Sequence, residues 1–211
     1  IYVPTTLLSM ADSAIGLKTS LNFQQVKNVI GTFYPPHEIY ICVRFLETLP
    51  QVEYQSGLGE IIKFLLMKHG EAAGRNSITH AINCLRNTRD RAAVIRVIQE
   101  SIRIKLDYMK GDEFDHGRRN LLNYGHELGH ALESVSKFHI PHGIGVLLGI
   151  FFANAVSCRR RWLDKSVFEY INEKLLFPNI PRGNGYLHKN YFHTGKLLQC
   201  MRQDKKRIAN G

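Results

Sequence analysis

The residues best suited to chemistry in this chain are three histidines and one glutamate. His126 and His130 are four positions apart, which places them one turn apart on the same face of a helix. His142 follows an Ile-Pro break and can fold back onto that face, and Glu60 lies in an otherwise apolar segment. Imidazoles with one carboxylate, leaving room for water or substrate, form the ligand set of a catalytic zinc ion. Packed core histidines are the plainer interpretation, but the glycines that flank these residues favour a metal site.

Length, charge and cysteine content narrow the class of protein. The 211 residues suffice for one or two domains, and the net charge of +10 comes from basic residues scattered over many segments. A nucleic-acid-binding protein normally concentrates its cations in a stripe, and only residues 159–161 and 205–207 form short basic runs. The cysteines are far apart, no segment resembles a signal peptide, and no apolar run reaches the roughly 18–20 residues that span a bilayer. We therefore expect a cytoplasmic protein without nucleic-acid or membrane partners.

Hydrophobic spacing predicts a mixed N-terminal part followed by helices. Residues 4–6 form a tight turn, the prolines of residues 31–36 favour a loop, and residues 38–43 are a β-branched and aromatic run typical of a buried strand. The expected helices begin near Tyr54 and then cover roughly residues 90–108, 118–135, 142–160 and 194–202. Because the first residues read as the end of a strand and the last as an open turn, we expect an internal piece of a longer protein.

Eight short motifs, taken in order, resemble the dehydroquinate synthase family of sugar-phosphate cyclases. They are Pro4-Thr5-Thr6-Leu7-Leu8, Asp12-Ser13-Ala14-Ile15-Gly16-Leu17-Lys18-Thr19, Lys27-Asn28-Val29-Ile30-Gly31, Leu46-Glu47-Thr48-Leu49-Pro50, Gly57-Leu58-Gly59-Glu60-Ile61-Ile62-Lys63, the block from Asn123 to Glu133, Pro141-His142-Gly143 and Asp204-Lys205-Lys206. Each motif alone is weak. Their order over nearly the whole chain makes the resemblance specific.

The resemblance implies an α/β plus α architecture that lacks the N-terminal half. Residues 1–55 would be the tail of an NAD-binding α/β domain, and residues 56–211 a mostly helical metal- and substrate-binding domain. The glycine-rich nucleotide-binding segment of the family lies before Pro4 and is not in this chain. The implied activity is conversion of 3-deoxy-arabino-heptulosonate 7-phosphate to 3-dehydroquinate and phosphate, with catalytic NAD and a divalent metal. The partner would be this small phosphorylated sugar acid, and a homodimer is an open option.

Carried over position by position, the resemblance also implies a role for individual residues. The metal, Zn²⁺ or Co²⁺, would be held by Glu60, His126 and His142. His130 would transfer protons rather than bind the metal, and Asp115 and Lys18 would act with it as catalytic residues. The substrate would contact Asp12, Lys18, Asn28, Lys63, Lys105, Arg119, Asn123 and one of Lys205 or Lys206. NAD would contact Thr5, Thr6, Asp12, Lys27 and Thr48.

The chain departs from the family pattern at several positions. The family commonly has Val-Gly-Gly-Lys where this chain has Ile15-Gly16-Leu17-Lys18, and often a threonine where Glu127 stands. Ile144 follows His142-Gly143 where an acid is frequent, and Asp115 replaces a glutamate. These departures bear on the substrate more than on the chemistry. They keep open a related cyclase of the deoxy-inosose or valiolone type, whose substrates have no carboxylate.

Three further functions compete with the cyclase. The segment from His126 to His130 matches the His-Glu-x-x-His motif of zinc proteases, with Glu127 as general base, but the extended form of that motif fails at Glu133 and Ser136. A metal-dependent alcohol dehydrogenase would not need the cations Lys18, Lys105, Arg119 and Lys205. An incomplete, inactive binding protein would not need the metal set. For Lys105 and Arg119, ordinary solvated helix charges are the alternative.

Overall fold

The computed structural model describes residues 1–23, 26–69, 75–86, 90–112 and 116–203. Its strands are β1 (Lys18–Phe23) and β2 (Val26–Phe33), and its α-helices are α1 (Gln51–His69), α2 (Arg75–Arg86), α3 (Arg91–Met109), α4 (His126–Val135), α5 (His142–Arg159), α6 (Lys165–Tyr170) and α7 (Thr194–Gln203). Short 3₁₀ helices cover Val43–Glu47, Arg118–Asn123, Phe177–Asn179 and Lys189–Phe192, and π-helical turns cover Ser9–Ser13 and Ile171–Leu176.

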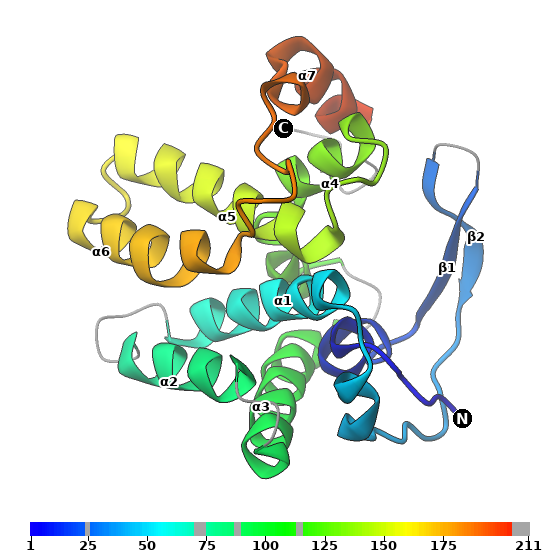
Figure 1. Cartoon of the computed structure of the whole chain (residues 1–211). Coiled ribbons are helices and arrows are strands. Elements are labelled where there is room, and N and C mark those ends of the chain that lie inside the picture. Colours follow the sequence, from blue (N-terminus) through cyan, green and yellow to red (C-terminus); the bar gives the residue numbers. More distant parts are fainter. Residues whose placement is uncertain (24–25, 70–74, 87–89, 113–115, 204–211) are drawn as a thin grey trace.

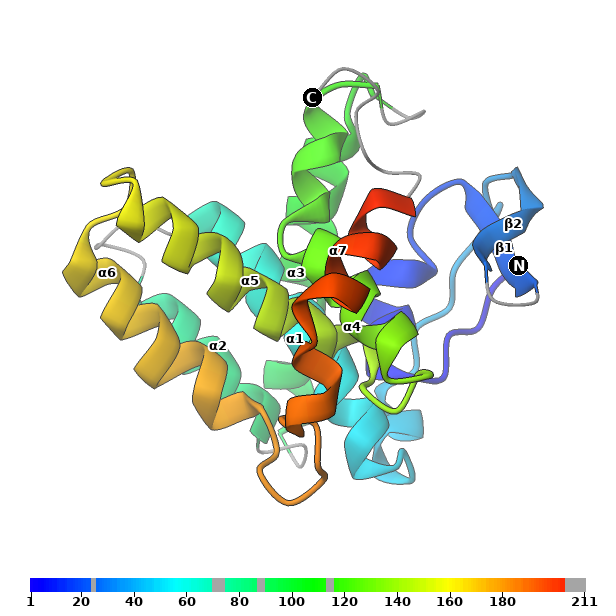
Figure 2. The ribbon, with the colours of Figure 1, turned by 90° about the horizontal axis from the view of Figure 1, so that it is seen from above.

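Helix α1 is the central element of a helical body. It packs against α5 on one side and against α2 and α3 on the other, and both views show it enclosed by these helices (Figures 1 and 2). Ile61, Ile62 and Phe64 of α1 are fully buried, as are Ile144 and Ile150 of α5. Burial of this apolar surface is the main force that holds α1 and α5 together.

The backbones of α1 and α5 touch where glycines face each other. A Cβ atom on Gly143 would lie 1.8 Å from the carbonyl oxygen of Ser56, and one on Gly59 would lie 2.3 Å from the carbonyl oxygen of Gly143. Side chains cannot fit at such distances, so glycine is required on both helices. This close approach brings Glu60, next to Gly59, against His142, next to Gly143.

The expected helix over residues 118–135 is wrong in its first part. Arg118–Asn123 is a 3₁₀ helix, and α4 begins only at His126. Between them Gly125 adopts φ +78°, a left-handed conformation that interrupts a helix and suits glycine. The start expected near Tyr54 is three residues late, since α1 begins at Gln51. The domain boundary expected between residues 55 and 56 lies along α1 and stays a prediction.

The helices expected from spacing near residues 90–108, 142–160 and 194–202 are confirmed as α3, α5 and α7. Asp90 caps α3, because its side chain accepts a hydrogen bond from the Ala93 N–H at 2.9 Å. Among the described residues, α5 alone is long and apolar enough in composition to cross a membrane, and 50% of that stretch is buried inside the fold. A core helix passes the same test, so this is weak support for a span.

The N-terminal part contains a hairpin that the sequence analysis did not predict. Strands β1 and β2 pair antiparallel, with Thr19 opposite Thr32 and Leu21 opposite Ile30, so residues 31–33 lie in a strand rather than in the expected loop. Pro35 and Pro36 follow the strand instead of interrupting it. The hairpin projects away from the helical body in both views (Figures 1 and 2).

The buried strand expected over residues 38–43 is also wrong. It is reduced to one isolated parallel bridge, in which the Tyr2 N–H donates to the Glu38 oxygen and the Tyr40 N–H to the Tyr2 oxygen, both at 2.9 Å. Tyr40 is 56% exposed. The β propensity of this run needs pairing on both sides to form a buried strand, and the described residues supply one short neighbour only.

Candidate metal centre

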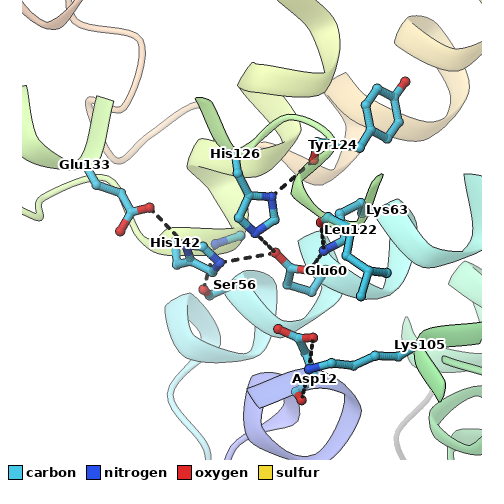
Figure 3. Close-up of polar contacts among 11 residues, drawn as sticks. Asp12, Ser56, Glu60, Lys63, Lys105, Leu122, Tyr124, His126, Glu133 and His142 are labelled. Atoms are coloured by element: carbon cyan, nitrogen blue, oxygen red, sulfur yellow. Dashed lines mark hydrogen bonds and ion pairs between the residues drawn. The ribbon is translucent and has the colours of Figure 1, made fainter. Parts of the chain in front are cut away.

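Three separate helices bring Glu60, His126 and His142 together. Glu60 lies in the middle of α1, and the histidines are the first residues of α4 and α5. The Oε1 atom of Glu60 is 3.4 Å from Nε2 of His126 and 3.2 Å from Nε2 of His142 (Figure 3). Glu60 is fully buried and His126 nearly so, while His142 is partly exposed. Their ligand atoms all lie within 4.8 Å of one another, close enough to share one ion.

The imidazoles of His126 and His142 are each oriented by a hydrogen bond at Nδ1, the ring nitrogen that does not face Glu60. Nδ1 of His126 lies 3.2 Å from the carbonyl oxygen of Tyr124, which can only accept, so this nitrogen carries the proton. Nδ1 of His142 lies 2.9 Å from Oε1 of Glu133, a carboxylate that accepts in the same way. Both Nε2 atoms consequently face Glu60. Metal-binding histidines generally show this arrangement, in which a carbonyl or carboxylate holds the nitrogen away from the metal.

The charges of the cluster suit a cation. Burial raises the pKa of Glu60, but Lys63 and the two histidines outweigh it and hold that pKa well below its usual range. Nζ of Lys63 is 2.5 Å from Oε2 of Glu60, yet neither carboxylate oxygen accepts a hydrogen bond of good geometry. For His142, burial lowers the pKa, while the hydrogen bond to Glu133 and the nearby carboxylate of Glu60 raise it to about 9. A carboxylate with unsatisfied oxygens beside two inward-facing imidazole nitrogens fits Zn²⁺ or Co²⁺.

His130 lies beside the cluster but not in the same triad. Its ring centroid is 5.3 Å from that of His126 and 5.8 Å from that of His142. A zinc protease would need His126 and His130 on one ion with Glu127 beside them. Among the described residues, two close triads occur: His126 belongs to the one with Glu60 and His142, and His130 to the one with Glu133 and His142. Glu127 is exposed. The geometry therefore favours the cyclase over the protease.

Two of the predicted substrate-binding cations are buried and paired. Lys63 donates to the carbonyl oxygen of Leu122 at 2.9 Å as well as meeting Glu60. Lys105 is 2.8 Å from Oδ1 of Asp12 and donates to the Asp12 carbonyl oxygen at 2.6 Å. Figure 3 draws both pairs. Since Lys105 and Arg119 are only 8% and 6% exposed, the alternative that they are solvated helix charges is wrong.

The backbone of Arg119 is held by Asp112, a residue that the sequence analysis did not single out. The carboxylate of Asp112 accepts the backbone N–H groups of His116 at 2.7 Å, and of Gly117 and Arg119 at 2.8 Å each. These hydrogen bonds lower the pKa of Asp112, the one from Arg119 most. An Nη2 atom of Arg119 would be 3.6 Å from a Cβ on Gly16, so its guanidinium reaches the segment between Asp12 and Lys18.

The other predicted site residues make local contacts or lie outside the description. Thr6 accepts the Ser9 N–H through Oγ1 at 3.1 Å, Asn123 donates to Asn120 at 3.4 Å, and Thr5, Thr48 and Lys18 are exposed. Lys27 and Asn28 belong to β2, but their side chains are outside the described part of the chain, as are the whole of Asp115, Lys205 and Lys206.

Sequence reasoning missed two residues of the centre. Glu133, which binds His142, is seven positions after His126 and three after His130, so helical spacing alone could have placed it on their face. Ser56 accepts the Gly143 N–H through Oγ at 3.0 Å and secures the first turn of α5. Nothing in the sequence pairs Ser56 with Gly143, since 87 residues separate them.

Comparison with known proteins shows which family the chain resembles along its length. The model of the 3-dehydroquinate synthase N-terminal region matches residues 1–56, and that of the C-terminal region matches residues 57–207. A 3-dehydroquinate synthase of Sulfolobus acidocaldarius is 39% identical over 217 residues, which cover 100% of this chain and 59% of that protein. The chain spans little more than half the length of the curated relatives it matches.

Two solved structures share the fold. The 2-epi-5-epi-valiolone synthase of Streptomyces hygroscopicus, with NAD⁺ and Zn²⁺ bound, has a TM-score of 0.73 and 23% identity over 95% of this chain and 55% of its own. A 2-deoxy-scyllo-inosose synthase complexed with carbaglucose-6-phosphate, NAD⁺ and Co²⁺ has a TM-score of 0.71 and 21% identity over 97% of this chain and 54% of its own. With both family models matched in order along the sequence, the chain belongs to the 3-dehydroquinate synthase family.

Proposed function

We propose that the protein is a cyclase that converts 3-deoxy-arabino-heptulosonate 7-phosphate to 3-dehydroquinate and phosphate. The observation that carries this proposal is the convergence of Glu60, His126 and His142, with both imidazoles held so that Nε2 faces the carboxylate. Curated relatives named 3-dehydroquinate synthase, 36% and 39% identical to this chain, support the same activity. Because this chain spans little more than half the length of these relatives, the proposed activity is that of a protein with their full length.

A divalent metal, Zn²⁺ or Co²⁺, would be held by Glu60, His126 and His142. When bound, it would lower the pKa of vicinal substrate hydroxyls. The two solved neighbours were each determined with NAD⁺ and one of these ions, which supports both cofactors here. NAD, when bound, would accept a hydride from one carbinol carbon and return it later in the cycle. We assign NAD contacts to Thr5, Thr6, Asp12, Lys27 and Thr48, within an NAD-binding portion formed by residues 1–55.

The chain's own side chains bind and orient the substrate beside this centre. Elimination of phosphate and the intramolecular aldol closure that follows both require proton transfers. His130 lies within 6 Å of both metal-centre imidazole rings and is partly exposed, so its imidazole can take and return a proton. Asp115 and Lys18 would assist it. Lys63, Lys105, Arg119, Asn123, Asn28 and one of Lys205 or Lys206 would hold the phosphate and carboxylate, which fixes the reacting carbons.

A cyclase acting on a sugar phosphate without a carboxylate is the second candidate. The fold likeness to the valiolone and inosose synthases supports it. The buried Arg119, next to the segment that carries Asp12 and Lys18, favours the acid substrate instead, because a guanidinium pairs with a carboxylate through two parallel hydrogen bonds.

Product analysis separates these candidates. The purified protein is incubated with NAD and Zn²⁺ or Co²⁺, and with either 3-deoxy-arabino-heptulosonate 7-phosphate or glucose 6-phosphate. We expect phosphate release and a carbocyclic product from the heptulosonate only. Turnover of glucose 6-phosphate alone would establish the second candidate. No phosphate release from either substrate by metal-loaded protein would overturn the proposed function.

A further inference from the structure

We propose that Glu133 is the positioning residue that selects where the metal binds. This inference rests on the proposed metal centre. It adds a role for a residue that contacts neither the metal nor the substrate in that centre. Glu133 lies on α4, is 4% exposed, and accepts the Nδ1 proton of His142 at 2.9 Å (Figure 3). This bond decides which nitrogen of His142 is left to face Glu60.

The need for a selector comes from a second cluster that shares His142. His130, Glu133 and His142 also have ligand atoms within 4.8 Å of one another, so they could hold an ion as well. The two clusters use Glu133 in opposite ways. In the first it orients His142 from outside, and in the second it would itself be a ligand. If Nδ1 of His142 and an oxygen of Glu133 bound the same metal, Nδ1 would carry no proton for Glu133 to accept. The two uses of Glu133 therefore exclude each other.

The hydrogen bond favours the first cluster. Because Glu133 holds a proton on Nδ1, Nε2 of His142 is the nitrogen that faces Glu60, 3.2 Å from Oε1, and that would offer its lone pair to a metal. A neutral imidazole has one nitrogen that donates and one that binds a metal, so fixing the proton fixes the metal-binding nitrogen. Carboxylate–histidine–metal arrangements of this kind also raise the basicity of the ligand.

The loop between α4 and α5 is built to keep Glu133 against His142. Lys137 and Phe138 both adopt left-handed φ angles, 53° and 62°, which reverse the chain sharply. The buried Ser136 hydroxyl donates to the Glu133 carbonyl oxygen at 3.1 Å and accepts the Ile140 N–H at 3.1 Å. Non-glycine residues hold such angles only where the surrounding structure imposes them. The connection over residues 136–141 therefore delivers both side chains to one place.

His126 provides an internal contrast. Its Nδ1 faces the main-chain oxygen of Tyr124, an acceptor that no side-chain substitution removes. His142 depends on a side chain instead. Substitution of Glu133 therefore tests orientation of one ligand while the other keeps its acceptor.

The test measures metal affinity by chelator competition and, for Co²⁺, the visible absorption spectrum of the protein. Glu133→Met keeps the side-chain size but removes the acceptor, and we expect metal binding to weaken about 10- to 100-fold. Glu133→Gln keeps one acceptor oxygen, so its loss should be smaller. Glu127→Gln is the matched control, because Glu127 is exposed on the same helix, and its affinity should equal that of the wild type.

Substitution of His130 shows whether Glu133 orients His142 or is itself a metal ligand in the second cluster. Under this proposal, His130→Asn leaves metal affinity within a few-fold of the wild type, while His126→Asn abolishes it. Loss of affinity in His130→Asn equal to that in His126→Asn would overturn the proposal and assign the ion to the second cluster. Unchanged affinity and spectrum in a folded Glu133→Met protein would overturn it too. A wild-type protein that binds no metal would instead reject the metal centre itself, and circular dichroism confirms folding of each variant.

Discussion

The metal centre and the N-terminal fifty residues differ in how their side chains are held. Glu60 and Lys63 are enclosed by packed helices and contact each other directly. In the N-terminal part, Ile30, Tyr34 and Tyr40 are more than half exposed, and Thr48 makes a single long contact with Phe45. Packing thus defines the geometry of the metal centre within the described chain. Among the residues assigned to NAD, Thr6 and Thr48 make local contacts, and Asp12 is held by Lys105. Single substitutions should have large effects in the first region and small ones in the second.

The largest effect is expected from Gly143→Val. A Cβ at this position meets the Ser56 carbonyl oxygen at 1.8 Å, and neither helix backbone can move aside without opening the core. We expect a loss of about 3 kcal/mol or more in the free energy of unfolding, measured by urea denaturation. Gly183→Ala is the control, because a Cβ there meets nothing within 4 Å. Equal stability of the two variants would show that α1 and α5 are not in backbone contact.

Glu60→Gln should remove both metal binding and part of the stability. It takes away a ligand and leaves Lys63 buried without its ion-pair partner, which costs about 3 kcal/mol in comparable buried pairs. The double variant Glu60→Gln/Lys63→Met should regain much of the lost stability but no metal affinity. Thermal unfolding and chelator competition measure the two properties separately. Metal affinity that survives in either variant would argue against Glu60 as a ligand.

Lys105 connects the two regions, since it joins α3 to Asp12 of the N-terminal part. We expect Lys105→Met and Asp12→Asn each to destabilise the fold, with a coupling energy of about 1 to 3 kcal/mol in a double-mutant cycle. The coupling should exceed that of the exposed pair Arg118 and Asp107, which serves as the reference. Additive effects at Lys105 and Asp12 would mean that the N-terminal part is not anchored there.

Tyr54 in the helical body should make stability depend on pH in the alkaline range. Burial raises its pKa from 10.0 to about 12, and its hydroxyl donates to the Leu85 oxygen at 2.5 Å. Because the folded state holds this proton more tightly than the unfolded state, the stability it contributes is complete below pH 10 and is lost as the pH rises toward 12. Tyr54→Phe should flatten that part of the stability curve, while Tyr40→Phe, at an exposed position, should leave it unchanged.

The smallest effect is expected from Ile30→Thr in the hairpin. Ile30 is 52% exposed on β2, and threonine retains the β-branched shape that suits a strand. We expect a change within about 0.5 kcal/mol in the free energy of unfolding. A loss several times larger would show that this face of the hairpin is covered in solution and that the two regions are more alike than their exposure indicates.

Prediction from sequence succeeded where a signal is local or where the family motifs carry it. The apolar spacing of α3 and α5 is a property of consecutive residues, and their ends were placed within a residue or two. The sequence does not indicate the hairpin, because its two strands show no clear alternation and the prolines at 35 and 36 favour a loop that extends over residues 31–33. The roles assigned to the site residues stay predictions, and Asp115, Lys205 and Lys206 also lie outside the described structure.

By itself, the sequence determined the residue types of the metal centre, the helices that carry them and the family to which the chain belongs. The resemblance also implied that His142 rather than His130 joins His126 at Glu60. Only the tertiary structure decided that these three side chains converge and that Glu133 orients His142. Helical spacing relates residues within one helix, but the approach of α1 to α5 depends on glycine contacts between segments more than eighty residues apart. Those contacts are set by packing of the whole core, which no local pattern records.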